Sequence, residues 1–541
     1  MPGDVSDVLV VGAGPTGLAL AAQLRAFGTS FRIVGRQPDR VHESRALAVQ
    51  PRTLEVLASL GLAEAMVDRG NPAMRVRLHA RGRTTAVPLF DIGLDDTAYP
   101  FLLFLSQADT EAILDEHLAR HDVIVERGVE LTDLDQGPDR VTCTLAHGDG
   151  RIEQLRARYV VGCDGAHSTV RERAGIEFAG GAYPQTFVLA DLDADGLEPG
   201  AVHVYLADPG MLFFFPLAEP AGWRLLGWPL GTVAPTAAEP TRAELQSLTD
   251  AYTADAPSLH EPVWATYFRL QHRHARAYRG GRVFVAGDAA HVHSPAGAQG
   301  MNTGIQDAWN LGWKLALVAD GIADPALLDT YQAERQPVGR RVLRFTDRAF
   351  TIATSTGPVT RFLRTRAAPQ LARFATRFTA GRAAGFRTLS QLAVDYRDSP
   401  AVADGRPRPR RGPRAGDRLP DAPVRLDDRP TTLHRACAAP RLHLLLTGTP
   451  GDWPGERVSS LADRYTGLVD VHRLTRRPAA GALHDTSGDA HRRLGLDRPD
   501  RPAHLLVRPD GHIAYRAAGI DLTGLGGHLT RWFPGPGSTV G

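Results

Sequence analysis

The sequence contains little cysteine. Its three cysteines, Cys143, Cys163 and Cys437, lie far apart and form no CxxC pair or zinc-ligand spacing. The sequence therefore predicts neither a disulfide scaffold nor a metal site, and the sparse cysteines favour a reducing cytoplasm.

Lysine is nearly absent, since Lys314 is the single lysine among 62 basic residues. Arginines alternate with acidic side chains along most of the chain, and 60 acidic residues bring the formal net charge to +2 at pH 7. A balance so close to neutral gives no global attraction to nucleic acid or to an anionic membrane, so we expect neither as a partner.

Long hydrophobic runs are also missing. No apolar stretch approaches the roughly 18–20 residues that a membrane helix needs, and the run Val8–Val11 near the N-terminus is only strand length. We therefore expect a soluble, unexported protein. With 541 residues, of which 43% are hydrophobic, the chain can form two to four domains.

The first nucleotide signal is a glycine-rich turn between a strand and a helix. Val8–Val11 predicts a buried parallel strand, a helical pattern runs on to Gly28, and Phe31–Val34 predicts a second strand. The turn between the first strand and the helix is a GxGxxG motif. It consists of Gly12, Ala13, Gly14, Pro15, Thr16 and Gly17. This context predicts a dinucleotide whose pyrophosphate lies at the helix N-terminus.

Each glycine of the motif has a physical reason. Gly12 permits the tight turn, Gly14 lets the backbone approach the pyrophosphate, and Gly17 allows close packing of helix on strand. An acidic residue for the ribose is expected about 20 residues further on, but Gly35 and then Arg36 stand there. The loss of one charge-assisted hydrogen bond, about 1.5–3 kcal/mol, weakens binding without abolishing it. Arg36 is a candidate contact to the adenosine phosphate.

Two later stretches supply further candidate contacts. An apolar strand beginning at Tyr159 leads into Asp164-Gly165, and the strand Val283–Ala286 delivers Gly287-Asp288, whose carboxylate can accept from a ribityl or ribose hydroxyl. Helix amides near Met301-Asn302 would stabilise negative charge on a reduced isoalloxazine ring. The turn before this helix contains Pro295, Gly297 and Gly300, and its histidines, His291 and His293, are interpreted as shaping the turn rather than as acid–base groups.

With GxGxxG, Asp164-Gly165 and Gly287-Asp288 in this order, the sequence resembles the class A flavoprotein monooxygenases of the para-hydroxybenzoate hydroxylase fold. It is most similar to the aromatic polyketide hydroxylases with a C-terminal thioredoxin-like domain. The resemblance implies an α/β protein: a GxGxxG-type, Rossmann-like FAD-binding domain, an inserted β-sheet substrate domain and a thioredoxin-like α/β domain.

The expected boundaries follow from that resemblance and from composition. The FAD-binding domain takes residues 1–177, with substrate-domain strands near 74–102, and resumes with a helical extension over 273–400. The middle, substrate-binding domain takes 178–272. A Pro/Arg-rich linker is expected over 401–416, followed by the thioredoxin-like domain, 417–541. That domain lacks a redox dithiol because Cys437 is its only cysteine.

The resemblance also assigns roles to residues. It implies FAD contacts by Arg45, Gln107 and Leu131, together with the turn containing Pro295 and Gly297. Arg45, Arg52 and Pro295 are the candidate catalytic residues, although a bulk-surface role for Arg52 is an equal alternative. The candidate substrate walls are aromatic: Phe90, Phe101, Phe213, Phe215, Trp223 and Trp228.

The implied reaction uses NADPH, or NADH, to reduce FAD, and O2 then forms a flavin hydroperoxide that hydroxylates a polycyclic aromatic, polyketide-like metabolite. The first alternative is Baeyer–Villiger oxidation of a polyketide ketone by the same intermediate. The second is a flavin-poor relative that binds its ligand without turnover, which only Gly35 favours. We expect a monomer or a homodimer.

Overall fold

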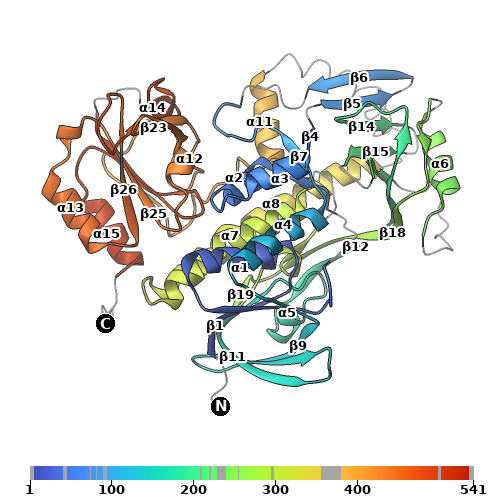
Figure 1. Cartoon of the computed structure of the whole chain (residues 1–541), viewed down its shortest axis with the longest axis horizontal. Helices are drawn as coiled ribbons and strands as arrows, with labels where there is room; N and C mark the ends of the chain where they lie inside the picture. Colours follow the sequence, from blue (N-terminus) through green and yellow to red (C-terminus); the bar gives the residue numbers. More distant parts are fainter. Residues whose placement is uncertain are drawn as a thin grey trace.

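Three sheets, each accompanied by its own helices, organise the chain (Figure 1). The structure is a computed structural model and describes residues 5–40, 46–73, 75–80, 82–88, 94–207, 210–217, 221–227, 239–253, 255–293, 298–354, 379–496 and 501–534. The predicted α/β class is confirmed. Among the described residues, no helix has the length and apolar character that a membrane span requires.

The N-terminal sheet contains the predicted strand–turn–helix–strand unit. Its central strands run parallel, with β1 between β2 and β11. The main path crosses six strands, in the order β19 (Arg279–Gly280), β20 (Val283–Val285), β11 (Ile152–Gly162), β1 (Val5–Val11), β2 (Phe31–Gly35) and β8 (Val125–Arg127). The hairpin of β9 (Val129–Gln136) and β10 (Val141–His147) pairs with β11.

Different layers cover the two faces of this sheet. On one face α1 (Pro15–Phe27), α4 (Gln107–Arg120) and α7 (Gly300–Ala319) share one apolar core with β1. On the other, β9, β10 and α5 (Thr169–Arg173) form a second core. Helix α1 begins with a proline and ends at Gly28, whose φ of 76° is left-handed, so the predicted helix is confirmed.

Four more helices accompany this core, and the first two of them pack in it. The short helices α2 (Pro51–Ala58) and α3 (Ala63–Arg69) precede the middle sheet in the chain. The long helix α8 (Asp329–Thr354) follows α7, and α11 (Thr379–Leu389) lies beside α2 in Figure 1. A small sheet of β3 (Ala48–Val49), β7 (Leu102–Phe104) and β4 (Asn71–Ala73) connects α2 to the middle sheet.

The middle sheet combines strands from separate parts of the chain. Strands β5 and β6, from the first third of the sequence, complete its edge beyond β14. Its order is β21 (His291–Val292), β18 (Trp264–Ala275), β12 (Phe178–Leu192), β16 (Trp223–Gly227), β15 (Met211–Pro216), β14 (Ala201–Leu206), β5 (Arg75–Ala80) and β6 (Arg83–Pro88). Helix α6 (Arg242–Asp250), with a Thr241–Glu244 capping box, packs in a core on one face. A two-stranded ladder of β13 (Ala194–Asp195) and β17 (Ser258–Leu259) lies beside it.

The C-terminal sheet has a mixed order with helices on both faces. Across the sheet come β22 (Ala403–Asp404), β29 (Ile513–Ala518), β28 (Ala503–Val507), β25 (Leu442–Thr447), β26 (Val469–Thr475), β27 (Leu483–His484), β23 (Pro423–Leu426) and β24 (Arg429–Thr432). Helices α13 (Gly455–Arg464) and α15 (Thr523–Trp532) take one face, and α12 (Leu433–Ala436) and α14 (Asp489–Arg493) the other. The predicted hairpin at Asp510-Gly511 is present between β28 and β29.

The expected linker at 401–416 needs correction. β22 lies within this stretch and pairs with β29, so the stretch is an edge of the C-terminal sheet. Buried Arg516 donates hydrogen bonds to the carbonyls of Arg411 and Pro413, and Gly416 donates to the carbonyl of Ile513. Composition predicted an irregular, polar segment, but these backbone contacts come from a distant strand.

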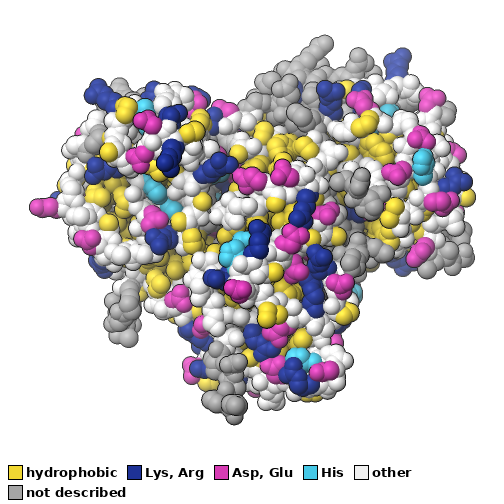
Figure 2. Space-filling model, viewed as in Figure 1, with side chains coloured by type: hydrophobic (Ala, Val, Ile, Leu, Met, Phe, Trp, Pro, Cys, Tyr) yellow, Lys and Arg dark blue, Asp and Glu magenta, His cyan; other side chains and the backbone are white. Residues whose placement is uncertain are grey.

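The surface has no extensive area of one charge on the face drawn in Figure 2. Arginines and acidic side chains are interspersed there, with apolar side chains between them. This distribution agrees with the formal net charge of +2.

Candidate active site

A cavity of about 290 Å³ lies where β1, β2 and β11 end. The site brings together segments from separate parts of the sequence. Its walls include these predicted residues: Gly12, Ala13, Gly14, Gly35, Arg36, Leu131, Asp164 and Gly165. This is the carboxyl edge of a parallel sheet, where α/β proteins bind nucleotides.

Gly12 and Gly17 hold the turn against its neighbours. Gly12 has a left-handed φ of 111°, and a side chain there would overlap the carbonyl of Cys163, next to Asp164. A side chain on Gly17 would overlap the backbone of Gly12. The turn and the close helix–strand packing therefore both require glycine. Gly14 faces the cavity, and the atom nearest to an added Cβ would be Glu111 Oε1 at 3.9 Å.

Asp164 is fixed by the start of α5. Its Oδ1 accepts a hydrogen bond from Ser168 Oγ at 2.5 Å, and its Oδ2 accepts one from Val170 N at 3.1 Å. Burial raises the pKa of Asp164 above its usual value, although these hydrogen bonds oppose the shift. Asp164 therefore lines the cavity with its carboxyl group fixed by the start of α5.

Gly35 ends β2 in the position of the expected acid. A Cβ added at Gly35 would lie 2.9 Å from Ala13 Cβ, so a larger side chain requires the turn to shift. Arg36 lines the cavity, and its Nη1 lies 3.6 Å from Oε1 of Glu130. The Arg36 side chain is 68% exposed, which leaves it accessible to an anionic ligand.

Glu111 is a cavity residue that the sequence reasoning missed. It is 1% exposed and accepts a hydrogen bond from Gln107 Nε2 at 2.8 Å, within the first turns of α4. Gln107 N donates to the carbonyl of Ala46 at 3.2 Å. The i, i+4 spacing of Gln107 and Glu111 was the available signal.

The Gly287-Asp288 motif lies beside the glycine-rich turn. An added side chain on Gly287 would meet Thr16 Oγ1 at 2.5 Å, and Gly287 N donates to Asp307 Oδ2 at 3.1 Å. The Asp307 carboxylate is also hydrogen-bonded to Nε2 of His291 and to Nε of Arg335, both at 2.7 Å. Burial raises the pKa of Asp307, but Arg335 and His291 outweigh it and hold that pKa below its usual value.

These contacts support the structural interpretation of the turn histidines. His291 is fully buried and hydrogen-bonded to Asp307, and His293 stacks on it with ring centroids 5.9 Å apart. Asp288, in contrast, is exposed at the end of β20.

The start of α7 is fixed by its own polar side chains. The helix begins at Gly300, so Met301 and Asn302 lie in its first turn, as predicted. Asn302 Oδ1 accepts from Gln50 N, and its Nδ2 donates to the carbonyl of Ala48, both at 2.8 Å. The side chain is therefore used to hold β3 against α7, and only the backbone amides of this turn are available to a ring.

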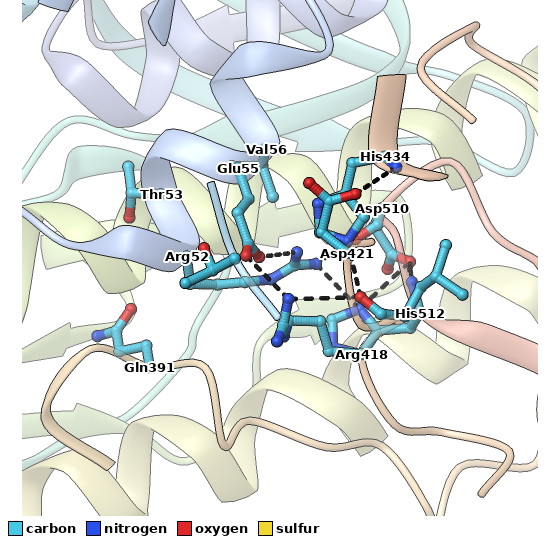
Figure 3. Close-up of polar contacts among 12 residues, drawn as sticks. Arg52, Thr53, Glu55, Val56, Gln391, Arg418, Asp421, His434, Asp510 and His512 are labelled. Atoms are coloured by element: carbon cyan, nitrogen blue, oxygen red, sulfur yellow. Dashed lines mark hydrogen bonds and ion pairs between the residues drawn. The ribbon is translucent and has the colours of Figure 1, made fainter. Parts of the chain in front are cut away.

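Arg52 lies at the boundary with the C-terminal domain and not beside the cavity. Its Nη1 lies 3.0 Å from Glu55 Oε2, and its Nη2 donates to the carbonyl of Asp510. Figure 3 shows Arg52, Glu55 and Arg418 pointing toward one another at the C-terminal hairpin. The bulk-surface alternative is wrong because Arg52 is 3% exposed. Its partners, Glu55 and Asp510, place the guanidinium between domains.

The aromatic wall candidates separate onto two faces of the middle sheet. Phe213 and Phe215 stack on each other with centroids 5.7 Å apart, and Phe104 lies 5.7 Å from Phe215. They share an apolar cluster with Ala48 and Ala298, next to the start of α7. Phe101 instead packs against the N-terminal core.

Trp223 requires a correction. It is 7% exposed and belongs to the core beneath α6, on the opposite face from Phe213 and Phe215. The antiparallel register pairs Trp223 with Pro216, and alternation along the strand then directs its side chain away from that face.

Arg224 is a second residue that the sequence reasoning missed. It stands opposite Phe215 in the ladder, and its Nε and Nη2 each lie 2.6 Å from the carboxylate of Asp191. Nη1 donates to the carbonyl of Ala46 at 3.2 Å, next to the predicted flavin contact Arg45 in sequence. Five predicted residues, Arg45, Phe90, Trp228, Pro295 and Gly297, lie outside the described residues.

This architecture and cavity are those of a nucleotide-binding α/β protein with a separate middle sheet. Two family models match the chain: "FAD binding domain" over residues 5–346 and "Aromatic-ring hydroxylase, C-terminal" over residues 412–536. The chain belongs to the FAD-dependent aromatic-ring hydroxylases, which are monooxygenases.

Two curated relatives and one solved structure cover nearly the whole chain. The 6-methylpretetramide 4-monooxygenase of Streptomyces rimosus is 38% identical over 97% of this chain and 93% of its own length. The pentachlorophenol 4-monooxygenase of Sphingobium chlorophenolicum is 35% identical, over 96% and 95%. The structure of OxyS anhydrotetracycline hydroxylase from Streptomyces rimosus superimposes with a TM-score of 0.78 at 31% identity, covering 98% of this chain and 100% of that chain.

Proposed function

We propose that the protein uses FAD, O2 and NADPH, or NADH, to hydroxylate a flat, polycyclic aromatic compound of the polyketide class. The observation that carries the proposal is the meeting of the GxGxxG turn, Gly35-Arg36, Leu131 and Asp164-Gly165 around one cavity. The tetracycline-type substrates named for two relatives support the substrate class. The pentachlorophenol enzyme makes a monocyclic phenol the alternative to test.

The described residues fit FAD. A cavity of about 290 Å³ is at the lower end of small-molecule pockets, a size that suits the adenosine and pyrophosphate portion. The amides of the Gly12–Gly17 turn and the N-terminus of α1 would hold the phosphates. Asp164 would accept hydrogen bonds from hydroxyl groups of FAD. Gln107, which lies beside Glu111, would donate hydrogen bonds to these groups or accept hydrogen bonds from them.

The ring would lie near the start of α7, beside Phe213 and Phe215. When bound, FAD supplies the oxygen-activating chemistry. The amides of Met301 and Asn302 would stabilise negative charge on the ring. The two stacked phenylalanines give an apolar surface that suits a flat aromatic substrate and excludes water.

A reducing compartment, the cytoplasm, is also part of the proposal. It is supported by the free thiols of Cys143, Cys163 and Cys437.

The deciding experiment measures oxygen-dependent NADPH oxidation by FAD-saturated protein, with a panel of polycyclic phenols and chlorinated monocyclic phenols. We expect oxidation to rise with a polycyclic phenol and one labelled oxygen from ¹⁸O2 to enter the product. Loss of an aromatic proton identifies hydroxylation, whereas a new ester carbonyl identifies Baeyer–Villiger oxidation and overturns the proposed reaction. Failure to retain supplied FAD would instead support the ligand-binding alternative.

A further inference from the structure

The C-terminal domain brings one cysteine and two histidines together on one face of its sheet. Cys437 follows α12, His443 lies in β25 and His472 in β26. The cysteine sulfur and one ring nitrogen of each histidine lie within 4.8 Å of one another. Sequence spacing gave no metal motif, because the helix and the two parallel strands bring these residues together only in the fold.

Hydrogen bonding determines which nitrogen of His443 carries a proton. His443 Nε2 lies 3.0 Å from the carbonyl of Ala439, which can only accept, so Nε2 carries the proton. Nδ1 of the neutral ring then presents a lone pair, and it lies 3.0 Å from Nε2 of His472. A carbonyl on the outer nitrogen is the usual partner of a metal-binding histidine, because it fixes both the tautomer and the ring orientation.

Cysteine coordinates a metal ion as the thiolate, so the Cys437 thiol must lose its proton when the ion binds.

A carboxylate adds negative potential to the cluster. Asp470 stands opposite His443 in the β25–β26 ladder and contributes a negative charge near the cluster. Asp470 Oδ1 is 3.0 Å from Nη1 of Arg441, which partly offsets its charge.

We propose that Cys437, His443 and His472 form a metal site for Zn²⁺ or a similarly thiophilic ion, with water as the fourth ligand. Zn²⁺ bonds of about 2.0–2.1 Å to nitrogen and about 2.3 Å to sulfur place two tetrahedral nitrogen ligands about 3.4 Å apart. The two ring nitrogens, 3.0 Å apart, need only a small opening. The Cys437 sulfur lies up to 4.8 Å from these ring nitrogens and must move closer to them.

The proton balance of binding is defined by these hydrogen bonds. His443 uses the lone pair already on Nδ1. His472, which donates through Nε2 in the ion-free pair, moves that proton to Nδ1 and coordinates through Nε2. The Cys437 proton is released to solvent, so one proton leaves for each ion bound. The ion would tie α12 to β25 and β26, which makes its role in the domain structural.

The test uses the full-length protein after chelator treatment, titrated with Co²⁺. We expect one equivalent to bind with intense visible bands of tetrahedral cobalt and a near-ultraviolet sulfur-to-cobalt charge-transfer band, and Zn²⁺ to bleach both. Cys437→Ser removes the charge-transfer band and His472→Gln lowers the Co²⁺ affinity at least about tenfold. The matched control is Cys143→Ser, a buried thiol in β10 that leaves the spectrum unchanged.

Two results would overturn the site. One is the absence of a charge-transfer band at excess Co²⁺, which would leave a hydrogen-bonded histidine pair only. The other is a band that survives Cys437→Ser. If Cys437→Ser does not fold, His472→Gln and the release of one proton per ion decide the question. None of these measurements uses FAD or NADPH, so failure here is separate from failure of the proposed hydroxylation.

Discussion

Arg508 and Glu334 form a two-point ion pair that is shielded from water and joins the C-terminal domain to α8. Nη1 and Nη2 of Arg508 lie 2.6 and 2.8 Å from the two carboxylate oxygens of Glu334. Lys314, the single lysine, adds its Nζ at 2.7 Å. Asp510, on the C-terminal hairpin, completes the cluster through Arg508. Because α7 carries Lys314 and also begins at the proposed flavin ring site, the hairpin is connected to that site through one helix.

Removing the shared carboxylate should destabilise the protein strongly. Glu334→Ala leaves Arg508 and Lys314 buried without their common partner, and we expect a loss of about 3–5 kcal/mol. Thermal unfolding measures this as a large fall in Tm. The matched control is Glu116→Ala, which breaks a surface pair with Arg69 whose side chains are 49% and 43% exposed, and should cost less than about 1 kcal/mol. Similar Tm shifts for the two variants would contradict a dominant role for the buried cluster.

Arg52 offers a direct choice between a catalytic and a structural role. Its guanidinium contacts Glu55 and the Asp510 carbonyl, so Arg52→Ala should lower the Tm by an amount equivalent to about 3–5 kcal/mol. We expect kcat/KM of the FAD-saturated, folded variant to change only a few-fold. A hundredfold fall in kcat with an unchanged Tm would restore the catalytic role. Arg69→Ala is the exposed arginine control.

Gly35 should limit FAD affinity, and the structure shows why a single substitution is insufficient. A side chain at Gly35 meets Ala13 Cβ at 2.9 Å, so we combine Gly35→Glu with Ala13→Gly. The recovered ribose hydrogen bond, about 1.5–3 kcal/mol, should tighten FAD about 10- to 150-fold, with a smaller gain for Gly35→Glu alone. Flavin fluorescence quenching gives the Kd, and Ala13→Gly alone is the control. An unchanged Kd in the double variant would show that residue 35 does not limit binding.

Local patterns predicted the turns, the strand and the helix start around the cavity. The roles of Gly12 and Gly17, the strand that leads to Asp164-Gly165 and the start of α7 depend on a few consecutive residues, and the structure has each of them. The order of these motifs gave the family resemblance, and the resemblance implied the cofactor.

Tertiary contacts were beyond the reach of such patterns. The position of Trp223 depends on strand register, since a shift of one residue would reverse its face. Arg52 lies in a sequence segment shared with predicted flavin contacts, yet its partners besides Glu55 come from a hairpin more than 450 residues later. Glu111 had only its i, i+4 spacing from Gln107 as a signal, and Arg224 became recognisable only from its register opposite Phe215.

The two faces of the middle sheet give a matched pair of variants. Phe213→Ala removes part of the proposed aromatic wall, and we expect KM for a polycyclic substrate to rise at least several-fold with a modest change in Tm. Trp223→Ala empties a site in the core beneath α6 and should cost about 3–5 kcal/mol of stability, with little change in KM once the protein is folded. The opposite pattern, a KM effect from Trp223 alone, would place the substrate on the α6 face.

The stability of the middle sheet should depend on pH through His79. Burial, with smaller effects of His203 and Arg77, lowers the pKa of His79 from about 6.5 to about 4. Between these two values the unfolded chain binds more protons than the folded protein, so stability falls as the pH falls through this window. The contribution is fully present above about pH 6.5 and levels off below about pH 4. Thermal unfolding across this range should therefore show a steeper fall in Tm for the wild type than for His79→Gln.

His260→Gln is the exposed control. A hydrogen bond to Asp195 raises the pKa of His260, so its small contribution is present at low pH and is lost as the pH rises. Parallel pH profiles for the wild type and His79→Gln would show that His79 does not control this dependence.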